Sequence, residues 1–193
     1  MPFAKANDGL IDKRGKLVSL DKPLNLHIGG REKHPDWFIV DSLDTDVVDL
    51  VANCSNLSMF PAASCGVIYC SHVLEHLSHD GELQKTLKGF HRILHANGKL
   101  MVSVPDLDVL CRSFLRSDLT SDARRFVMHM MYGGQVDAYD FHKTGFNFHL
   151  LHESLSAANF QRFERVESLG LFNDSSEIKF DDERVSLNMI ASR

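Results

Sequence analysis

The sequence has 193 residues, of which 44% are hydrophobic and 24% are charged, and this balance excludes collagen-like and largely disordered chains. The 21 Lys and Arg against 26 Asp and Glu give a net charge of −5, which argues against a surface built to follow nucleic-acid phosphates. No apolar run reaches the about 18 residues of a membrane helix, and the N-terminus carries charges where a signal peptide is apolar. We therefore expect a single cytoplasmic domain that binds neither nucleic acid nor membrane, with an oligomeric state that the sequence does not indicate.

Short apolar runs in the first half of the chain predict strands covered on both faces, as in a parallel sheet. These predicted strands are 23–28, 37–40, 47–52, 67–70 and 99–104. Between the last two, apolar residues recur at helical spacing over 80–95, with Asp80 as the expected N-cap and Asn97-Gly98 as the expected stop.

The second half predicts further helices at 107–115, 123–131 and 150–158, with a polar and aromatic loop between the last two. Two strands, at 163–168 and 185–191, close the chain. Alternating strands and helices indicate an α/β fold with a mostly parallel sheet, and the closing pair adds an antiparallel edge strand. We expect one domain over 1–193, with a helical and loop insert at about 106–149 covering the site.

Several motifs follow these strands in a recognisable order: 26–30, Asp41, 56–61, 67–76 and 102–106. Together they resemble the class I S-adenosylmethionine-dependent methyltransferases, and more narrowly the predicted methyltransferases of the "type 11" group. The resemblance implies a Rossmann-like fold, with a mostly parallel seven-stranded sheet and helices on both faces. It also implies S-adenosyl-L-methionine as cofactor and S-adenosylhomocysteine as product.

The same resemblance implies a cofactor site at the carboxyl ends of the strands. Gly29 and Gly30 would let the backbone approach the methionine moiety, and Asp41 would accept hydrogen bonds from the ribose hydroxyls. Arg31 or Lys33 could pair with the methionine carboxylate. The residues expected to hold the cofactor are His27, Gly29, Gly30, Arg31, Asp41, Asn53, Asn56, Leu57 and Ser71.

Three residues depart from the family pattern. The acidic residue before the glycines is His27, the second glycine of the motif is Arg31, and an acidic residue at the adenine edge is Asn53. The interval from Arg31 to Asp41 is also too short for a first helix and a strand, so we expect that helix to be reduced to a turn. An alternative interpretation is therefore a non-catalytic binding module that keeps the fold with a degenerate cofactor motif.

The residues expected to face the methyl acceptor are His142, Asp106 and His72. A neutral His can take a proton near pH 7, because its ordinary pKa is about 6.5. His142 lies in a dense polar and aromatic stretch that would cover the open strand ends. We expect a small-molecule acceptor that is methylated on oxygen or nitrogen.

The 11 histidines raise the question of a metal. His72, Glu75 and His76 match the H-x-x-E-H pattern of inverted zinc metalloproteases, so a zinc hydrolase is a distant alternative. That pattern needs a long helix of its own, whereas this segment starts at the end of a buried strand. We therefore expect no metal, and we expect Leu74 and His76 to pack the turn.

Overall fold

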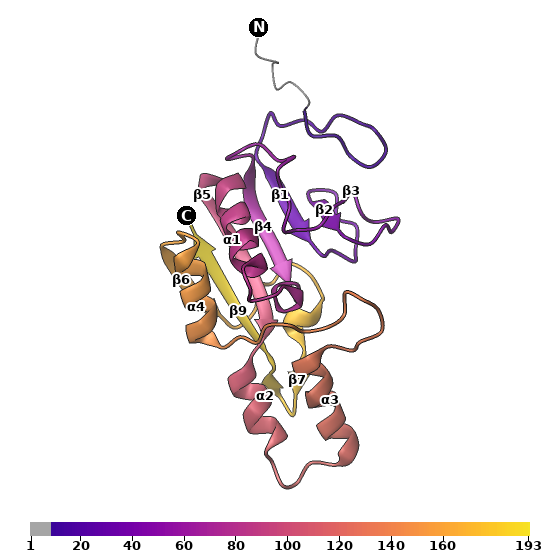
Figure 1. Cartoon of the computed structure of the whole chain (residues 1–193), viewed down its shortest axis with the longest axis vertical. Coiled ribbons are helices and arrows are strands. Elements are labelled where there is room, and N and C mark those ends of the chain that lie inside the picture. The colour runs from indigo at the N-terminus through magenta and orange to yellow at the C-terminus, as the bar shows by residue number, and fades with distance from the viewer. Residues whose placement is uncertain (1–8) are drawn as a thin grey trace, which may run out of the picture.

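The computed structural model describes residues 9–193, which form a seven-stranded sheet in the order β3-β2-β1-β4-β5-β9-β6 (Figure 1). Its strands are β1 (Leu24–Ile28), β2 (Phe38–Asp41), β3 (Leu50–Val51), β4 (Cys65–Ser71), β5 (Leu94–Pro105), β6 (Arg162–Val166) and β9 (Ser186–Ser192). The helices are α1 (Glu82–Ile93), α2 (Leu107–Phe114), α3 (Ser121–Tyr132) and α4 (Phe148–Ala157), with the 3₁₀ helices η1 (Leu74–His76) and η2 (Ser175–Glu177). Two short strands, β7 (Lys179–Phe180) and β8 (Glu183–Arg184), make a separate hairpin.

The strand order is that of a doubly wound α/β sheet with one strand added. β1 to β5 pair with one another in parallel, whereas β9 runs antiparallel to both β5 and β6. The prediction of a mostly parallel seven-stranded sheet with one antiparallel strand is confirmed, and that strand lies second from the edge because β6 pairs with its outer side. The order reverses between β1 and β4, so the crevice at their carboxyl ends is where such sheets bind ligands.

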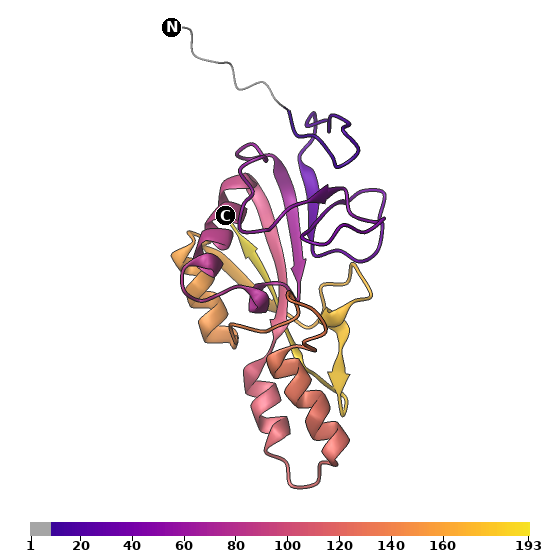
Figure 2. The same cartoon turned by 45° about the vertical axis from the view of Figure 1, so that its right-hand side comes forward.

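Both helices that pack on the sheet cover the same face, as the two views show (Figures 1 and 2). Leu87 and Phe90 of α1, and Leu151 of α4, join the core formed by Leu26 and Ile68. Their spacing along each helix places apolar side chains on one stripe, which explains why the helical period could be found in the sequence. α1 starts at Glu82 after a left-handed Gly81, so the N-cap is Gly81 and not Asp80.

The opposite face of the sheet is covered mainly by irregular segments. Tyr69 and Met101 point to this side and pack against Leu169, Trp37 and Phe172. Among residues 9–193, the first helix after β1 is reduced to a turn, as its short interval predicts, and the segment that follows β6 lies on this face. Helices on both faces were expected: α1 and α4 cover one face, and on the other the 3₁₀ helix η2 brings Ser176 within 3.4 Å of the Tyr69 hydroxyl.

α2 and α3 form a helical hairpin that projects beyond the carboxyl end of β5 (Figure 2). The Thr120 side chain caps α3 by accepting the Ala123 N–H at 3.2 Å, and Leu110 of α2 buries itself with Val127 of α3. The hairpin points away from the sheet, whereas the loop after it, 133–147, returns to the strand ends. None of the helices in the described part of the chain has the length and apolar run that a bilayer crossing requires.

Candidate active site at the strand ends

The register of the parallel strands places three of the expected cofactor residues next to one another at the carboxyl edge of the sheet. Ile28 of β1 pairs with Val40 of β2 on one side and with Cys70 of β4 on the other. The next residues along these strands are Gly29, Asp41 and Ser71, so they lie side by side at the switch point of the sheet.

Gly29 occupies a turn that only glycine adopts easily. Its φ is +75°, and its N–H donates to the Val40 carbonyl at 2.9 Å. A Cβ at this position would lie 2.6 Å from Cγ2 of Val73. Gly30 is packed just as closely, because its Cβ would come within 2.8 Å of the His27 ring. The two glycines therefore let the chain turn tightly at the end of β1.

The polar side chains at this edge are partly engaged by local turns. Asp41 Oδ1 accepts the Leu43 N–H at 2.7 Å, which fixes the carboxylate at the end of β2. Asn53 and Asn56 use their side-chain oxygens in the same way, on Ser55 and on Ser58. Both asparagines are exposed, so their amide NH₂ groups remain available to a ligand.

Ser71 and Leu57 differ in what they offer. The Ser71 hydroxyl is buried and has no hydrogen-bond partner within residues 9–193, which makes it an unsatisfied group at the site. Leu57 is only 4% exposed and packs in the core beneath α1, beside Gly89. Leu57 is thus a core residue of the α1 face of the sheet.

The His27 ring packs against Gly30 and aromatic side chains, whereas Arg31 lies in solvent. The His27 ring packs against Phe172 and Tyr69, with ring centroids 4.3 and 4.9 Å away, on the face of the sheet opposite α1 and α4. Burial lowers the pKa of His27 from 6.5 to about 4, so this side chain is a neutral core residue. Arg31 is exposed on the turn after β1.

His72 follows β4 with an unusual backbone and a fixed ring. Its φ is +51°, and its Nε2 lies 2.8 Å from the Ser186 hydroxyl. Ser186 donates its own proton to the Ser175 carbonyl, so it accepts from Nε2–H of His72. The unprotonated Nδ1 then faces Glu75 Oε1 at 3.3 Å. Burial and the nearby His142 lower the pKa of His72 to about 3, which keeps it neutral.

Glu75 is the most deeply buried acidic residue of the site. It is 1% exposed, and neither carboxyl oxygen has a hydrogen-bond partner in the described chain. Burial raises its pKa from 4.5 to about 8, so the side chain is largely protonated at neutral pH. A buried carboxyl without partners is costly and marks a functional position more often than a structural one.

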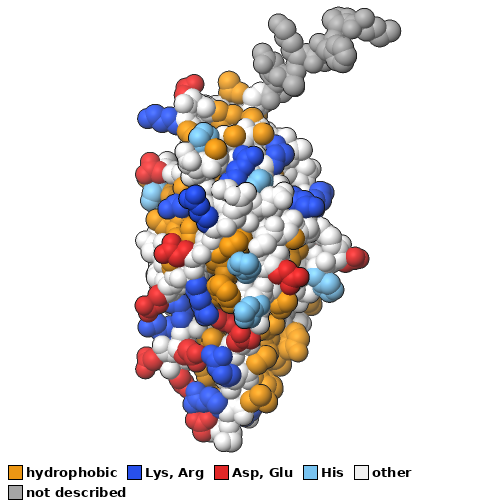
Figure 3. All heavy atoms as spheres, turned by 90° about the vertical axis from the view of Figure 1, so that its left-hand side faces the viewer, with side chains coloured by type: hydrophobic (Ala, Val, Ile, Leu, Met, Phe, Trp, Pro, Cys, Tyr) orange, Lys and Arg blue, Asp and Glu red, His pale blue; other side chains and the backbone are white. Residues whose placement is uncertain are grey.

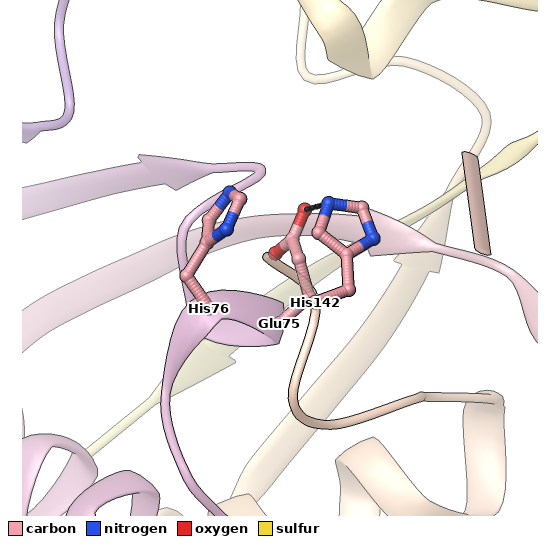
Figure 4. A group of neighbouring side chains, drawn as sticks. All are labelled: Glu75, His76 and His142. Atoms are coloured by element: carbon pink, nitrogen blue, oxygen red, sulfur yellow. Dashed lines mark ion pairs between the residues drawn. The ribbon is translucent and has the colours of Figure 1, made fainter. Parts of the chain in front are cut away.

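His142 is carried to Glu75 by the loop 133–147. The N–H groups of Lys143 and Thr144 both donate to the Glu75 carbonyl, at 2.7 and 3.0 Å, and the Thr144 hydroxyl donates to the Leu77 carbonyl at 2.6 Å. These bonds hold His142 Nε2 4.0 Å from Glu75 Oε1 (Figure 4). Its Nδ1 is buried without a partner in this part of the chain.

His76 is the third member of this group, although from the sequence we expect it only to pack the turn. Its ring lies against that of His142 with centroids 4.8 Å apart, and its Nδ1 is 3.2 Å from the Phe141 carbonyl (Figure 4). Burial lowers the pKa values of both His76 and His142. The H-x-x-E-H spacing was the available signal, but Glu75 and His76 lie in a single 3₁₀ turn, His72 precedes it, and no long helix as in a metalloprotease carries them.

Asp106 is placed apart from this group. Its Oδ1 accepts the Asp108 N–H at the start of α2, and its Oδ2 pairs with Arg165 at 3.0 Å. Both oxygens are therefore engaged in holding α2 and β6 at the end of β5.

A family model described as a methyltransferase domain matches residues 31–102, which run from the turn after β1 to the middle of β5. Residues 31–102 are therefore similar to a methyltransferase domain. The resemblance seen in the sequence is confirmed, and the methyltransferase fold extends beyond the matched segment through β9.

Solved structures share this methyltransferase fold at low sequence identity. An S-adenosylmethionine-dependent methyltransferase from Archaeoglobus fulgidus gives a TM-score of 0.57 at 14% identity, over 90% of this chain and 87% of that one. One from Thermotoga maritima gives 0.56 at 16%, over 89% and 82%. The 1,6-didemethyltoxoflavin-N1-methyltransferase of Burkholderia thailandensis, solved with its namesake compound and S-adenosylhomocysteine, gives 0.52 at 16%, over 89% and 72%. No curated protein matches the sequence.

Proposed function

We propose that this methyltransferase domain binds S-adenosylmethionine across the carboxyl ends of β1, β2 and β4 and transfers its methyl group to oxygen or nitrogen of a small molecule. The observation that carries the proposal is the alignment of Gly29, Asp41 and Ser71 at the switch point of the sheet. These three residues offer a tight turn, a hydrogen-bond acceptor and an unsatisfied hydroxyl at one place.

The chain's own groups fit the cofactor's parts. Asp41 would accept from the ribose hydroxyls, and the unpartnered Ser71 hydroxyl would bond the methionine end. Exposed Arg31 would reach the methionine carboxylate, while the amides of Asn53 and Asn56 would border the adenine. When bound, the sulfonium supplies an activated methyl group, so the protein needs to supply alignment and exclusion of water.

On the acceptor side, His142 and His72 are the residues that support the proposal. Burial first, and the neighbouring His76 second, lower the pKa of His142, so its imidazole is neutral near pH 7 and can take a proton from the acceptor. Its side chain is 9% exposed, which restricts water at this end of the sheet. Asp106 is not needed for this step, because its carboxylate is already bound by Asp108 and Arg165.

Three features favour a small acceptor in the cytoplasm. The net charge is −5, and positive and negative side chains are interspersed over the face shown in Figure 3, unlike the basic stripe that tracks nucleic acid. The loop 133–147 is bonded to the turn at the end of β4 through Lys143 and Thr144, and we infer that it would border a small acceptor there. The four cysteines are unbonded, which suits a reducing compartment.

The proposal is tested by supplying S-adenosylmethionine with a labelled methyl group to the protein together with a cell extract. We expect label in products that pass a filter retaining macromolecules, and we expect His142→Ala to reduce it by about 100-fold or more. Asp41→Ala should reduce it through weaker cofactor binding. Label transferred to retained macromolecules, or no transfer at all, would contradict the proposal.

A non-catalytic binding module is the second candidate. Its support is that His27, which replaces the acidic residue of the family pattern, is buried among aromatic rings on the other face. Such a module would bind neither S-adenosylmethionine nor S-adenosylhomocysteine, so a cofactor titration separates it from the enzyme.

A further inference from the structure

Three potential metal ligands converge beside the strand ends, although the sequence predicts no metal. They are Glu75 and His76 of η1 and His142 of the returning loop, and one ligand atom from each lies within 4.8 Å of the others (Figure 4). We propose that Glu75, His76 and His142 form a binding site for a divalent late first-row metal ion of the zinc class.

The buried polar atoms of this group are the first support. Both carboxyl oxygens of Glu75, of which Oε1 lies 4.0 Å from Nε2 of His142, have no hydrogen-bond partner within the described chain. His72 offers no hydrogen bond to the ionised form of Glu75, the form that binds a metal, because His72 gives its only ring proton to Ser186 and presents a lone pair to the carboxyl group. A cation placed among these atoms would compensate for the burial of the carboxylate.

The orientation of His76 is the second support. Its Nδ1 lies 3.2 Å from the Phe141 carbonyl and donates to it, which leaves Nε2 as the nitrogen with a lone pair. A backbone carbonyl that fixes the tautomer in this way is the usual outer partner of a metal-bound histidine. The contact comes from the residue next to His142, so the same loop that carries one ligand orients another.

The backbone keeps the three ligands together. Glu75 and His76 are consecutive, and the two residues after His142 bond to the Glu75 carbonyl. Zinc binds nitrogen and oxygen at about 2.0–2.2 Å, so ligand atoms on one ion lie at most about 4 Å apart. The group needs only small side-chain rotations to close on an ion.

The ligand types define the metal class. Two imidazoles and one carboxylate suit Zn²⁺, Co²⁺, Ni²⁺ or Fe²⁺ and disfavour Mg²⁺ and Ca²⁺, which prefer oxygen. Three protein ligands leave a position for water or another ligand, as in catalytic zinc sites. With an ion bound, His142 would act as a ligand, so this inference goes beyond the proposed function and does not depend on cofactor binding.

The test is a titration of the metal-stripped protein with Zn²⁺ by calorimetry and with Co²⁺ by absorption spectroscopy, without cofactor. We expect one ion per chain, a tetrahedral or five-coordinate Co²⁺ spectrum, and a raised melting temperature with Zn²⁺. His142→Ala and His76→Ala should weaken binding by at least about 100-fold. Glu75→Gln keeps the shape of the side chain and should weaken it by at least about tenfold.

Two exposed histidines, His79 and His129, provide matched controls, and their alanine variants should bind as the parent does. Circular dichroism of each variant confirms that it is folded. If the parent shows no saturable binding, the proposal is wrong. It is also wrong if the ion binds equally well to folded Glu75→Gln and His142→Ala, because the ion is then held elsewhere. Neither result bears on whether S-adenosylmethionine binds.

Discussion

Replacing His27 by Phe should make the protein less sensitive to acid. His27 is 4% exposed at the end of β1, between the rings of Phe172 and Tyr69. Burial lowers its pKa from 6.5 to about 4, so the folded protein does not protonate it in mild acid, whereas the unfolded chain does. Phe keeps an aromatic ring in the same place and cannot take a proton.

The size of the effect follows from the two pKa values. Above pH 7, His27 is neutral in both states and contributes nothing to the pH dependence. As the pH falls through 6.5 toward 4, the unfolded state binds a proton that the folded state does not, and stability is lost. Between pH 7 and pH 5 this loss is about 2 kcal/mol, and it approaches about 3 kcal/mol below pH 4.

Urea unfolding at pH 7 and pH 5 measures this difference. The fluorescence of Trp37 is a suitable probe, because it is the only tryptophan and its ring lies 6.2 Å from that of His27. The drop in unfolding free energy from pH 7 to pH 5 should be about 2 kcal/mol smaller in His27→Phe than in the parent. His95→Phe, at an exposed position, is the control. Equal drops in all three proteins would refute the idea that burial keeps His27 neutral.

Three further substitutions test the supports of the site. Gly29→Ala should lower the free energy of unfolding in urea by about 2 kcal/mol or more, because its φ is left-handed and its Cβ clashes with Val73. Adding Val73→Ala should restore only the part of the stability that the clash costs, and full restoration would contradict the backbone strain. Arg92→Met removes two bonds to carbonyls of the 57–60 turn and should lower the unfolding free energy by about 2 kcal/mol, and a loss near zero would contradict this. Thr144→Val removes the hydrogen bond from the Thr144 hydroxyl to the Leu77 carbonyl, and amide hydrogen exchange in the loop 133–147 should become at least about fivefold faster. Unchanged exchange would show that other contacts hold the loop.

Much of the fold could be predicted because it depends on local patterns. The apolar runs that became β1, β2, β4 and β5 and the periodic stripe of α1 are visible in the sequence, and so is the missing first helix. The cover of the second sheet face could not be predicted. It depends on Phe172 and Leu169, which reach across the fold to Tyr69 from a segment with no periodic pattern.

Part of the candidate site could be predicted from the sequence and part could not. Gly29, Asp41 and Ser71 were predictable, because strand ends of a parallel sheet meet at one edge. The group around Glu75 was not, because His142 reaches it only through the loop after α3, and sequence spacing carries no information on such a return. The ligand contact that the motif suggests for His27 stays a prediction, and the structure adds that its side chain packs in the aromatic cluster.

Calorimetric titration with S-adenosylmethionine and S-adenosylhomocysteine tests the central claim most directly. We expect saturable binding of both compounds to the parent protein. We also expect both compounds to bind at least about tenfold more weakly to Asp41→Ala, which loses a hydrogen-bond acceptor for the ribose. Asp46→Ala, at an exposed position in the following loop, should bind as the parent does. No binding of either compound at millimolar concentration would contradict the account.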